Sequence, residues 1–378
     1  MTTKQNKIIG ARIREARLAK GYSMSDLSRL VGDISKQAIS QYESGDITPT
    51  AEKFEKIVNV LGFPHDYFYS QTPVVLNEPI FFRKYKTAQN KECDMAKCRV
   101  KWMVEILDYL QDFFDFVNVN VIEKVEPKPY SDEEIENIAV EVRKLWGMGL
   151  GPISDLHLLL ENNGFIISKS NLGERKMDAC STRYGDRPLQ FLTSDKSSAC
   201  RSRFDAAHEL GHRILHQAWV DFDYLNNKDN YERIEYEANR FAGALLMPRE
   251  SFMREVYSDS FDSLINLKRR WKVSIAMIMY RGRNLGVFNE NQYEYLQRQR
   301  SWKGFKTREP LDDEIPDEEP RTLNKAMNIL IKQKIQSVEQ ILDSIKLPVH
   351  EIEALCNLDM GSLNTNNKVP TLRLIKSI

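Results

Sequence analysis

The sequence has 378 residues and a mass of 44.0 kDa, which allows two or three domains, and its 42% hydrophobic content excludes a long disordered chain. Its 54 basic residues balance its 54 acidic residues, so any nucleic-acid contact must come from a local patch. No apolar stretch approaches the ~18 residues of a membrane span, and the start of the chain lacks a secretory signal. With five sparsely spaced cysteines, we expect a soluble, cytoplasmic protein with no membrane partner and no disulfide framework.

The first seventy residues are predicted to form four short amphipathic helices. Apolar residues recur at helical spacing from residue 7 to 19, and Ser23 and Ser35 stand where helix caps are expected. The predicted breaks lie at Gly21, Gly32 and Gly45. Two short helices joined by a glycine-containing turn form a helix-turn-helix, whose second helix, 35–44, is expected to enter the major groove of DNA.

The start of that second helix supplies the predicted DNA contacts. Lysine can address guanine acceptors and glutamine can address adenine. The predicted DNA-binding residues are Ser35, Lys36, Gln37, Ser40 and Gln41, with Arg12, Arg14 and Arg17 as candidates for phosphate contacts. The helical pattern alone leaves a protein-interaction bundle as an alternative. The segment 23–63, however, resembles the lambda-repressor-like (Xre) family, and this resemblance implies double-stranded DNA as a partner.

A second motif, HELGH at 208–212, indicates a metal site. On a helix, His208 and His212 are four residues apart and share one face, so their imidazoles can converge on one zinc ion. Glu209 can take a proton from water activated by the metal. His216 is too far along the helix from His208 to join the same ion comfortably, so we predict that it supports the site or packs beside it.

A catalytic zinc needs a third protein ligand, and the best candidate lies on a predicted helix at 234–248. Glu235 can be that ligand, and Asn239, four residues later on the same face, can orient a ligating histidine. Glu237 is expected to point into solvent, although it remains an alternative ligand. Small residues along this helix should allow it to approach the HELGH helix closely.

The residues 201–216, followed by the 235–248 segment, resemble the ImmA/IrrE family of metallopeptidases, and the resemblance extends over most of 130–310. It implies His208, His212 and Glu235 as zinc ligands and Glu209 as general base. It also implies a fold of helices on a small sheet whose strands include 164–168 and 188–193. The expected cofactor is Zn²⁺, without an organic cofactor.

The implied activity is peptide-bond hydrolysis by a zinc endopeptidase. Tyr231, Tyr236 and His216 are candidates for stabilising the oxyanion, and the sequence does not choose among them. Because a DNA-binding domain is fused to the peptidase, we expect a transcription regulator. The resemblance to the ImmA/IrrE family implies that it cleaves a repressor-type protein in a mobile-element or stress response. The alternative is a transcription factor whose peptidase-like domain senses a ligand or zinc without turnover.

The expected fold class is multidomain: an all-α helix-turn-helix domain, an α+β zincin-like metallopeptidase domain and a small helical C-terminal tail. A strongly apolar helix is predicted at 94–117, either packed on the peptidase or forming a homodimer contact. The acidic, proline-containing stretch before the tail is expected to be a flexible linker, and the last dozen residues to be loosely held. The predicted boundaries are 1–70 for the DNA-binding domain, 71–129 for a connecting basic and helical segment, 130–308 for the peptidase, 309–321 for the acidic linker and 322–378 for the tail.

Overall fold

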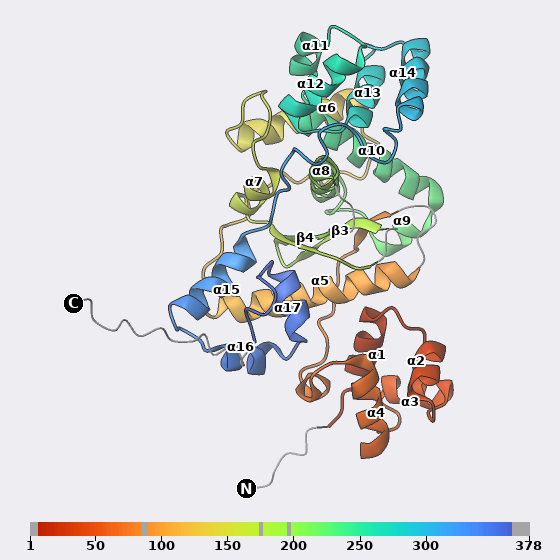
Figure 1. Cartoon of the computed structure of the whole chain (residues 1–378), viewed down its shortest axis with the longest axis vertical. Coiled ribbons are helices and arrows are strands. Elements are labelled where there is room, and N and C mark those ends of the chain that lie inside the picture. Colours follow the sequence, from red (N-terminus) through yellow and green to blue (C-terminus); the bar gives the residue numbers. More distant parts are fainter. Residues whose placement is uncertain (1–6, 85–89, 174–176, 195–197, 365–378) are drawn as a thin grey trace, which may run out of the picture. The chain divides into compact units, whose positions relative to one another are not determined.

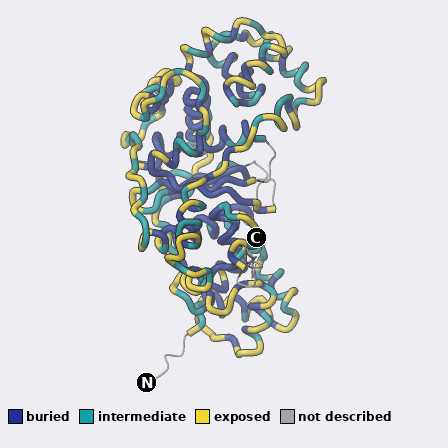
Figure 2. The backbone as a smooth tube through the Cα atoms, turned by 60° about the vertical axis from the view of Figure 1, so that its left-hand side comes forward, coloured by how far each residue is buried: buried dark blue, intermediate teal, exposed yellow. Residues whose placement is uncertain are grey.

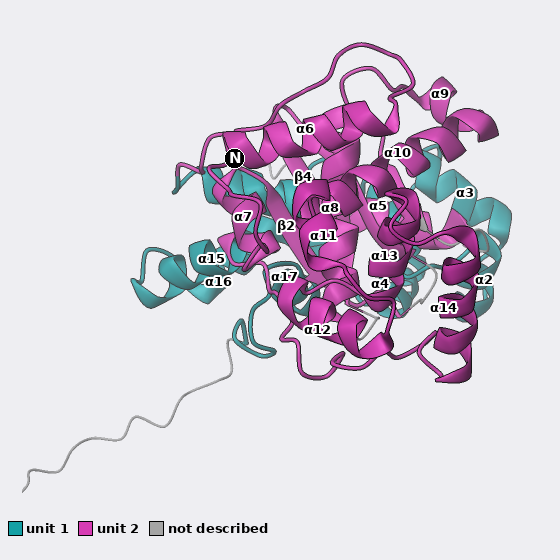
Figure 3. Ribbon diagram, turned by 90° about the horizontal axis from the view of Figure 1, so that it is seen from above, with its two compact units in different colours: residues 1–74, 101–114, 323–378 teal, residues 75–100, 115–322 magenta. Residues whose placement is uncertain are grey.

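The computed structural model describes residues 7–84, 90–173, 177–194 and 198–364, and the side chain of residue 84 is outside this description. The chain divides into two compact units (Figure 3). Unit 1 comprises residues 1–74, 101–114 and 323–378, and unit 2 comprises 75–100 and 115–322. No helix among the described residues is long and apolar enough to cross a membrane. The predicted loosely held end of the chain lies outside the described residues.

Four helices, α1 (Gly10–Ala19), α2 (Met24–Val31), α3 (Lys36–Ser44) and α4 (Ala51–Leu61), open unit 1 (Figure 1). The predicted caps explain where they start: the Ser23 side chain accepts from Asp26 N in a capping box, and Ser35 accepts from Ala38 N. Gly45 ends α3 with a left-handed backbone (φ 81°). A Cβ at Gly10 would lie 2.1 Å from the Tyr42 carbonyl oxygen, so only glycine lets α1 pack this closely on α3.

Two of the three arginines predicted to grip phosphates are instead buried in unit 1. Arg17 forms a two-pronged pair with Glu43, with Nε–Oε1 and Nη2–Oε2 distances of 2.6 and 2.8 Å. Arg12 is bound to Glu15 and Glu105, at 2.8 Å in each case. Both predictions were wrong, because Glu105 and Glu43 of α3 hold these two side chains inside unit 1, where they cannot reach DNA. Arg14 is exposed.

The rest of unit 1 consists of the short helix η1 (His65–Tyr69), the second half of α5 (Asn90–Gln111) and three C-terminal helices. Helix α5 begins earlier than the predicted helix at 94–117 and ends earlier, at Gln111, after which the backbone turns at residues 112–113. The C-terminal helices are α15 (Thr322–Lys332), α16 (Val338–Ile345) and α17 (Val349–Leu355). The predicted helical tail is therefore confirmed for the described part of the chain.

Unit 2 is built on a four-stranded sheet in the order β1-β3-β4-β2. The strands are β1 (Phe81–Lys84), β2 (Ile166–Ser170), β3 (Met177–Tyr184) and β4 (Arg187–Thr193). β3 and β4 form an antiparallel hairpin, β2 runs parallel to β4, and β1 runs antiparallel to β3. The predicted strands at 164–168 and 188–193 correspond to β2 and β4, whereas β1 and β3 were not predicted.

Helix α8 (Ala199–Leu215), which carries HELGH, packs on β3 and β4 and against α10 (Lys228–Leu246). Gly211 is the point of closest approach, since a Cβ there would lie 3.1 Å from Ala238 Cα. Buried positions concentrate on the sheet and on the central helices of unit 2 (Figure 2). The remaining helices are α6 (Asp132–Leu145), α7 (Leu156–Asn162), α9 (Phe222–Asn226), α11 (Arg249–Glu255), α12 (Phe261–Trp271), α13 (Ile275–Asn284) and α14 (Glu290–Trp302). These elements confirm the predicted mixed α+β fold with a small sheet.

The acidic stretch 309–321 is not a free linker. Glu309 accepts from the backbone nitrogens of Ile275 and Ala276 at the start of α13 and pairs with the buried Lys268 at 3.0 Å. Glu318 pairs with the buried Arg203 and accepts from Leu156 N at the start of α7. Because these carboxylates cap helices and neutralise buried cations, the segment is fixed to unit 2. The expectation of a flexible linker, drawn from composition, was wrong.

Candidate metal centre

Two histidines of α8 and one glutamate of α10 converge at one point of unit 2. His208 Nε2 and His212 Nε2 lie 3.0 Å apart, and the Glu235 carboxylate lies 3.5 Å from the first and 3.2 Å from the second. Ligand atoms placed 2.0–2.1 Å from a tetrahedral zinc are separated by about 3.3 Å. The donor types and their spacing therefore fit a zinc ion, and this is the group of potential metal ligands found in the part of the chain that the structure describes.

Asn239 and Arg83 contact the far side of His208. Asn239 Oδ1 lies 3.2 Å from His208 Nδ1, and its amide nitrogen donates to the Glu235 carbonyl at 2.7 Å. Arg83 Nη1 lies 2.9 Å from the same Nδ1 and donates to Asn239 Oδ1 at 3.0 Å. Burial, with the charge of Arg83, lowers the pKa of His208 to about 3, so the imidazole is neutral, as a metal ligand must be.

A buried line of hydrogen bonds supports His212 from behind. His212 Nδ1 lies 3.0 Å from His216 Nδ1, and His216 Nε2 lies 3.0 Å from Glu237 Oε2. Glu237 Oε1 also accepts from Tyr130 N and from Arg233 Nε, both at 3.1 Å. The prediction that Glu237 points into solvent was wrong: it is 1% exposed. The sequence around Glu237 gave no indication that its side chain is buried, because its partner His216 directly follows a different helix, α8.

Glu209, the predicted general base, is fully buried beside the sheet. Its Oε2 accepts from the Ser181 hydroxyl of β3, and its Oε1 has no hydrogen-bond partner among the residues that the structure describes. Burial raises the pKa of Glu209 well above its usual value. One carboxylate oxygen is thus left for a group that enters the site. Sequence reasoning missed Ser181, because nothing near it in the chain marks it as a partner of α8.

Strand β1 brings residues to the metal cluster that the sequence did not predict. The Phe81 ring stacks on the His212 ring, with centroids 4.6 Å apart and an angle of 14°. Tyr231, one of the three candidates for oxyanion stabilisation, donates from its hydroxyl to the Phe82 carbonyl at 2.9 Å. Burial and the charges of Glu235 and Glu209 raise the pKa of Tyr231 well above its usual value, so it stays a donor. Tyr236 is bound to Asp132 instead, at 2.7 Å.

A hollow of about 420 Å³ begins at Arg83 and Asn239, beside the cluster. Its apolar wall includes Phe204, Met277 and Tyr280. Its charged lining consists of Arg83, Arg201, Arg300, Lys306, Glu309 and Asp312, and the two acidic residues are both bound to Lys268.

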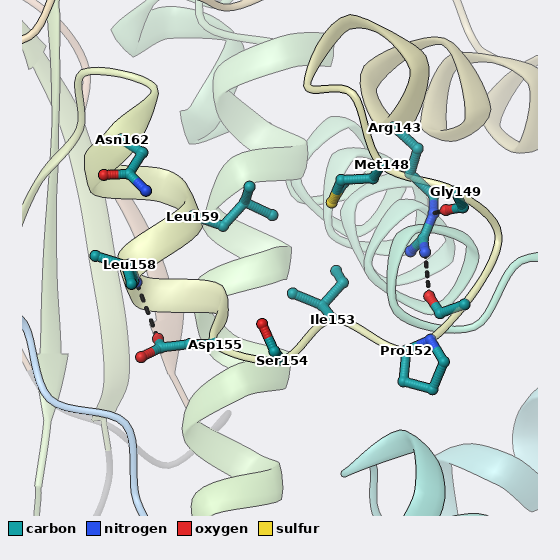
Figure 4. A pocket seen from close by; sticks show the side chains of 11 residues that line it. Arg143, Met148, Gly149, Pro152, Ile153, Ser154, Asp155, Leu158, Leu159 and Asn162 are labelled. Atoms are coloured by element: carbon teal, nitrogen blue, oxygen red, sulfur yellow. Dashed lines mark hydrogen bonds between the residues drawn. The ribbon is translucent and has the colours of Figure 1, made fainter.

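Another hollow, between α6 and α7, has no comparable chemistry (Figure 4). Its charged groups are Asp155, which caps α7 and pairs with Arg321, and the Arg143 guanidinium, which donates to the carbonyls of Gly149, Gly151 and Leu245. Burial lowers the pKa of Arg143 to about 10. Since its hydrogen bonds go to backbone carbonyls, Arg143 holds the loop after α6 in place, and this hollow is not the candidate site.

In unit 1, the predicted DNA-contacting residues lie on the outer face of α3. Ser35, Lys36, Gln37 and Ser40 are exposed and Gln41 is partly exposed. Ser35 also caps the helix. The side chains near the start of the helix are thus accessible, as direct readout of base edges requires.

Comparison with protein-family models gives two matches. Residues 168–282 match the IrrE N-terminal-like domain of the M78 peptidases, and residues 13–68 match a helix-turn-helix domain. The first range contains the whole cluster of His208, His212 and Glu235, and the second contains α2 to α4. Both resemblances inferred from the sequence are thereby confirmed. A search of curated proteins found no match.

Proposed function

Because the chain joins a helix-turn-helix DNA-binding domain to an IrrE-like M78 peptidase domain, we propose that it is a transcription regulator with zinc-dependent endopeptidase activity. Its substrate is a regulatory protein of the repressor type, cleaved in a mobile-element or stress response. The observation that carries this proposal is the convergence of His208, His212 and Glu235 beside a buried glutamate with one uncommitted oxygen.

Zinc, when bound, supplies Lewis-acid activation of water and of a peptide carbonyl. The residues that would hold it are His208, His212 and Glu235. Asn239 Oδ1, 3.2 Å from His208 Nδ1, would accept the Nδ1 proton in the tautomer that binds zinc through Nε2, whereas Arg83 Nη1, 2.9 Å from Nδ1, can only donate to that nitrogen. His216 and Glu237 have the corresponding role for His212. When His216 donates from Nε2 to the Glu237 carboxylate, its Nδ1 can accept the Nδ1 proton of His212, and Nε2 of His212 is left free to bind.

Glu209 is the base in this proposal. It takes a proton from the attacking water and delivers it to the leaving nitrogen, while the Ser181 hydroxyl keeps its carboxylate oriented. The Tyr231 hydroxyl is the best-placed donor to a peptide carbonyl, because it already donates to one at 2.9 Å. His216, which faces His212 and Glu237, is not placed for that role.

The test is the substitution Glu209→Gln, because zinc binding does not need this residue whereas hydrolysis does. We expect a full complement of zinc by metal analysis and no cleavage of casein or of a co-expressed Xre-type repressor. The matched control is Glu133→Gln on the exposed face of α6. If the wild-type protein cleaves nothing and Glu209→Gln regulates transcription normally, the domain is a sensor without turnover.

A further inference from the structure

Strand β1 lies where an extended substrate would be expected to bind. An extended peptide commonly adds to the edge of a sheet by antiparallel pairing. Without β1, the edge of the sheet would be β3, which carries the Glu209 partner Ser181, and β1 pairs antiparallel with this strand. We propose that β1 is a bound substrate: the chain cleaves its own Phe82–Arg83 bond. This inference rests on the proposed peptidase activity.

The alternation of side chains along β1 directs two of them at the metal ligands. Phe81 stacks on His212 and Arg83 reaches His208, so these two side chains face α8. Phe82, between them, faces the opposite side of the sheet, where Lys97 of α5 lies 5.7 Å from its ring. The side chains on either side of Phe82 therefore contact both histidines of the cluster.

The Phe82 carbonyl has the contacts that a scissile carbonyl needs. Its oxygen accepts from the Tyr231 hydroxyl at 2.9 Å, and Tyr231 is itself close to Glu235 and Glu209. In the strand register Phe81 faces Ser181, the residue bound to Glu209. Tyr231, the oxyanion donor in this proposal, thus contacts the Phe82 carbonyl directly, and Glu209, the base, is bound to the residue that pairs with Phe81.

Arg83 occupies the mouth of the hollow beside the cluster, as the first side chain after a scissile bond would. Its Nε donates to Asp205 at 2.5 Å, and its guanidinium lies 5.0 Å from the centre of the Phe204 ring. Asn239 accepts from its Nη1. A carboxylate, an amide oxygen and an aromatic face together recognise a guanidinium, so this pocket selects arginine after the cleaved bond.

The reaction consumes one water molecule. The Phe82–Arg83 C–N bond breaks and a C–O bond forms, so that Phe82 acquires the new carboxylate and Arg83 the new amino group. Glu209 moves the proton from water to the Arg83 nitrogen. The bond lies between the two matched domains, which end at residue 68 and begin at residue 168. Cleavage therefore disconnects the DNA-binding domain from the peptidase domain in the chain.

The experiment is to prepare the full chain free of metal, add Zn²⁺, and follow the products by denaturing intact mass spectrometry and N-terminal sequencing. We expect fragments 1–82 and 83–378 at a rate independent of protein concentration. Tyr231→Phe and Arg83→Ala should each slow cleavage at least tenfold, and Glu209→Gln should abolish it. Arg254→Ala, which removes an exposed arginine of α11, is the matched control and should cleave at the wild-type rate.

Hydrogen exchange of the metal-free chain gives a readout that does not depend on turnover. The amides of β1 should be protected by pairing with β3, and Arg83→Ala should accelerate their exchange while α12 is unaffected. Casein separates this inference from the proposed function. If casein is hydrolysed in a Glu209-dependent way but the 82–83 bond stays intact, self-cleavage is wrong and β1 is an inhibitory strand, and if neither is cleaved both proposals fall.

Discussion

His212, in the last turn of α8, and His216, directly after this helix, have their Nδ1 atoms 3.0 Å from each other, and Glu237 is bound to the far nitrogen of His216. All three side chains are buried. If His216 donates from Nε2 to the carboxylate, its Nδ1 can accept the Nδ1 proton of His212. His212 then presents the lone pair of Nε2 to the cluster, as a zinc ligand must.

Replacing His216 should therefore weaken zinc binding without removing a ligand. We expect His216→Phe to reduce zinc affinity about 10- to 100-fold, because His212 loses the partner that fixes its tautomer and orientation. Competition with a fluorescent chelator measures this change. His65→Phe, at a half-exposed histidine of η1, is the control and should bind zinc normally. An unchanged affinity in His216→Phe would mean that His216 only fills space.

Removing Glu235 should have a larger effect, because it takes away one of three ligands. We expect Glu235→Ala to purify with little zinc, and zinc should no longer raise its melting temperature, since a ligand stabilises a protein only by binding its folded state. Metal analysis and thermal unfolding with and without Zn²⁺ check both expectations. Full zinc content in Glu235→Ala would show that the third ligand is another residue.

In the DNA-binding unit, the residues expected to contact DNA differ from the residues that stabilise its fold. Lys36→Ala on the exposed start of α3 should weaken operator binding by about 1–3 kcal/mol and leave folding unchanged. Arg17→Ala should instead destabilise unit 1 by about 3–5 kcal/mol, because it leaves Glu43 buried without its partner. Binding titrations with DNA and hydrogen exchange in α1 distinguish the two effects. Arg14→Ala, at an exposed neighbour, should not affect stability.

Short-range regularities explain what could be predicted here from the sequence. The four-residue spacing of His208 and His212 places both on one face of a helix wherever that helix packs. The caps at Ser23 and Ser35 act within three residues, so α2 and α3 begin where predicted.

What could not be predicted depends on partners far away in the chain. Arg83 contacts His208, which lies 125 residues later in the chain. The strand β1, with four residues, is too short for an alternating pattern to be recognised in the sequence. Glu237 and Arg17 look like solvent-facing charges until the helix that covers each is known. The acidic composition of 309–321 led to the wrong prediction of a free linker. Acidic residues that cap helices and acidic residues in a flexible linker have the same composition, so the sequence does not distinguish them.

Acid sensitivity of unit 2 should depend on His157, whose side chain is fully buried and whose two ring nitrogens have no hydrogen-bond partner in the described part of the chain. Burial, with the charge of Lys169, lowers its pKa from 6.5 to about 4, although Asp317 acts in the opposite direction. Well above pH 6.5 the imidazole is neutral in both the folded and the unfolded states. As the pH falls toward 4, the unfolded state takes up a proton that the folded state does not, and the free energy of unfolding decreases by about 3 kcal/mol.

The variant His157→Phe removes this titration, so its free energy of unfolding should fall less between pH 6.5 and pH 4 than that of the wild-type protein. Urea unfolding followed by tryptophan fluorescence measures the difference, because four of the five tryptophans, all except Trp102, lie in unit 2. His350→Phe, which replaces an exposed histidine, should keep the wild-type pH dependence. Parallel pH profiles for His157→Phe and the wild-type protein would show that His157 takes up its proton equally in both states, and that the acid sensitivity lies elsewhere.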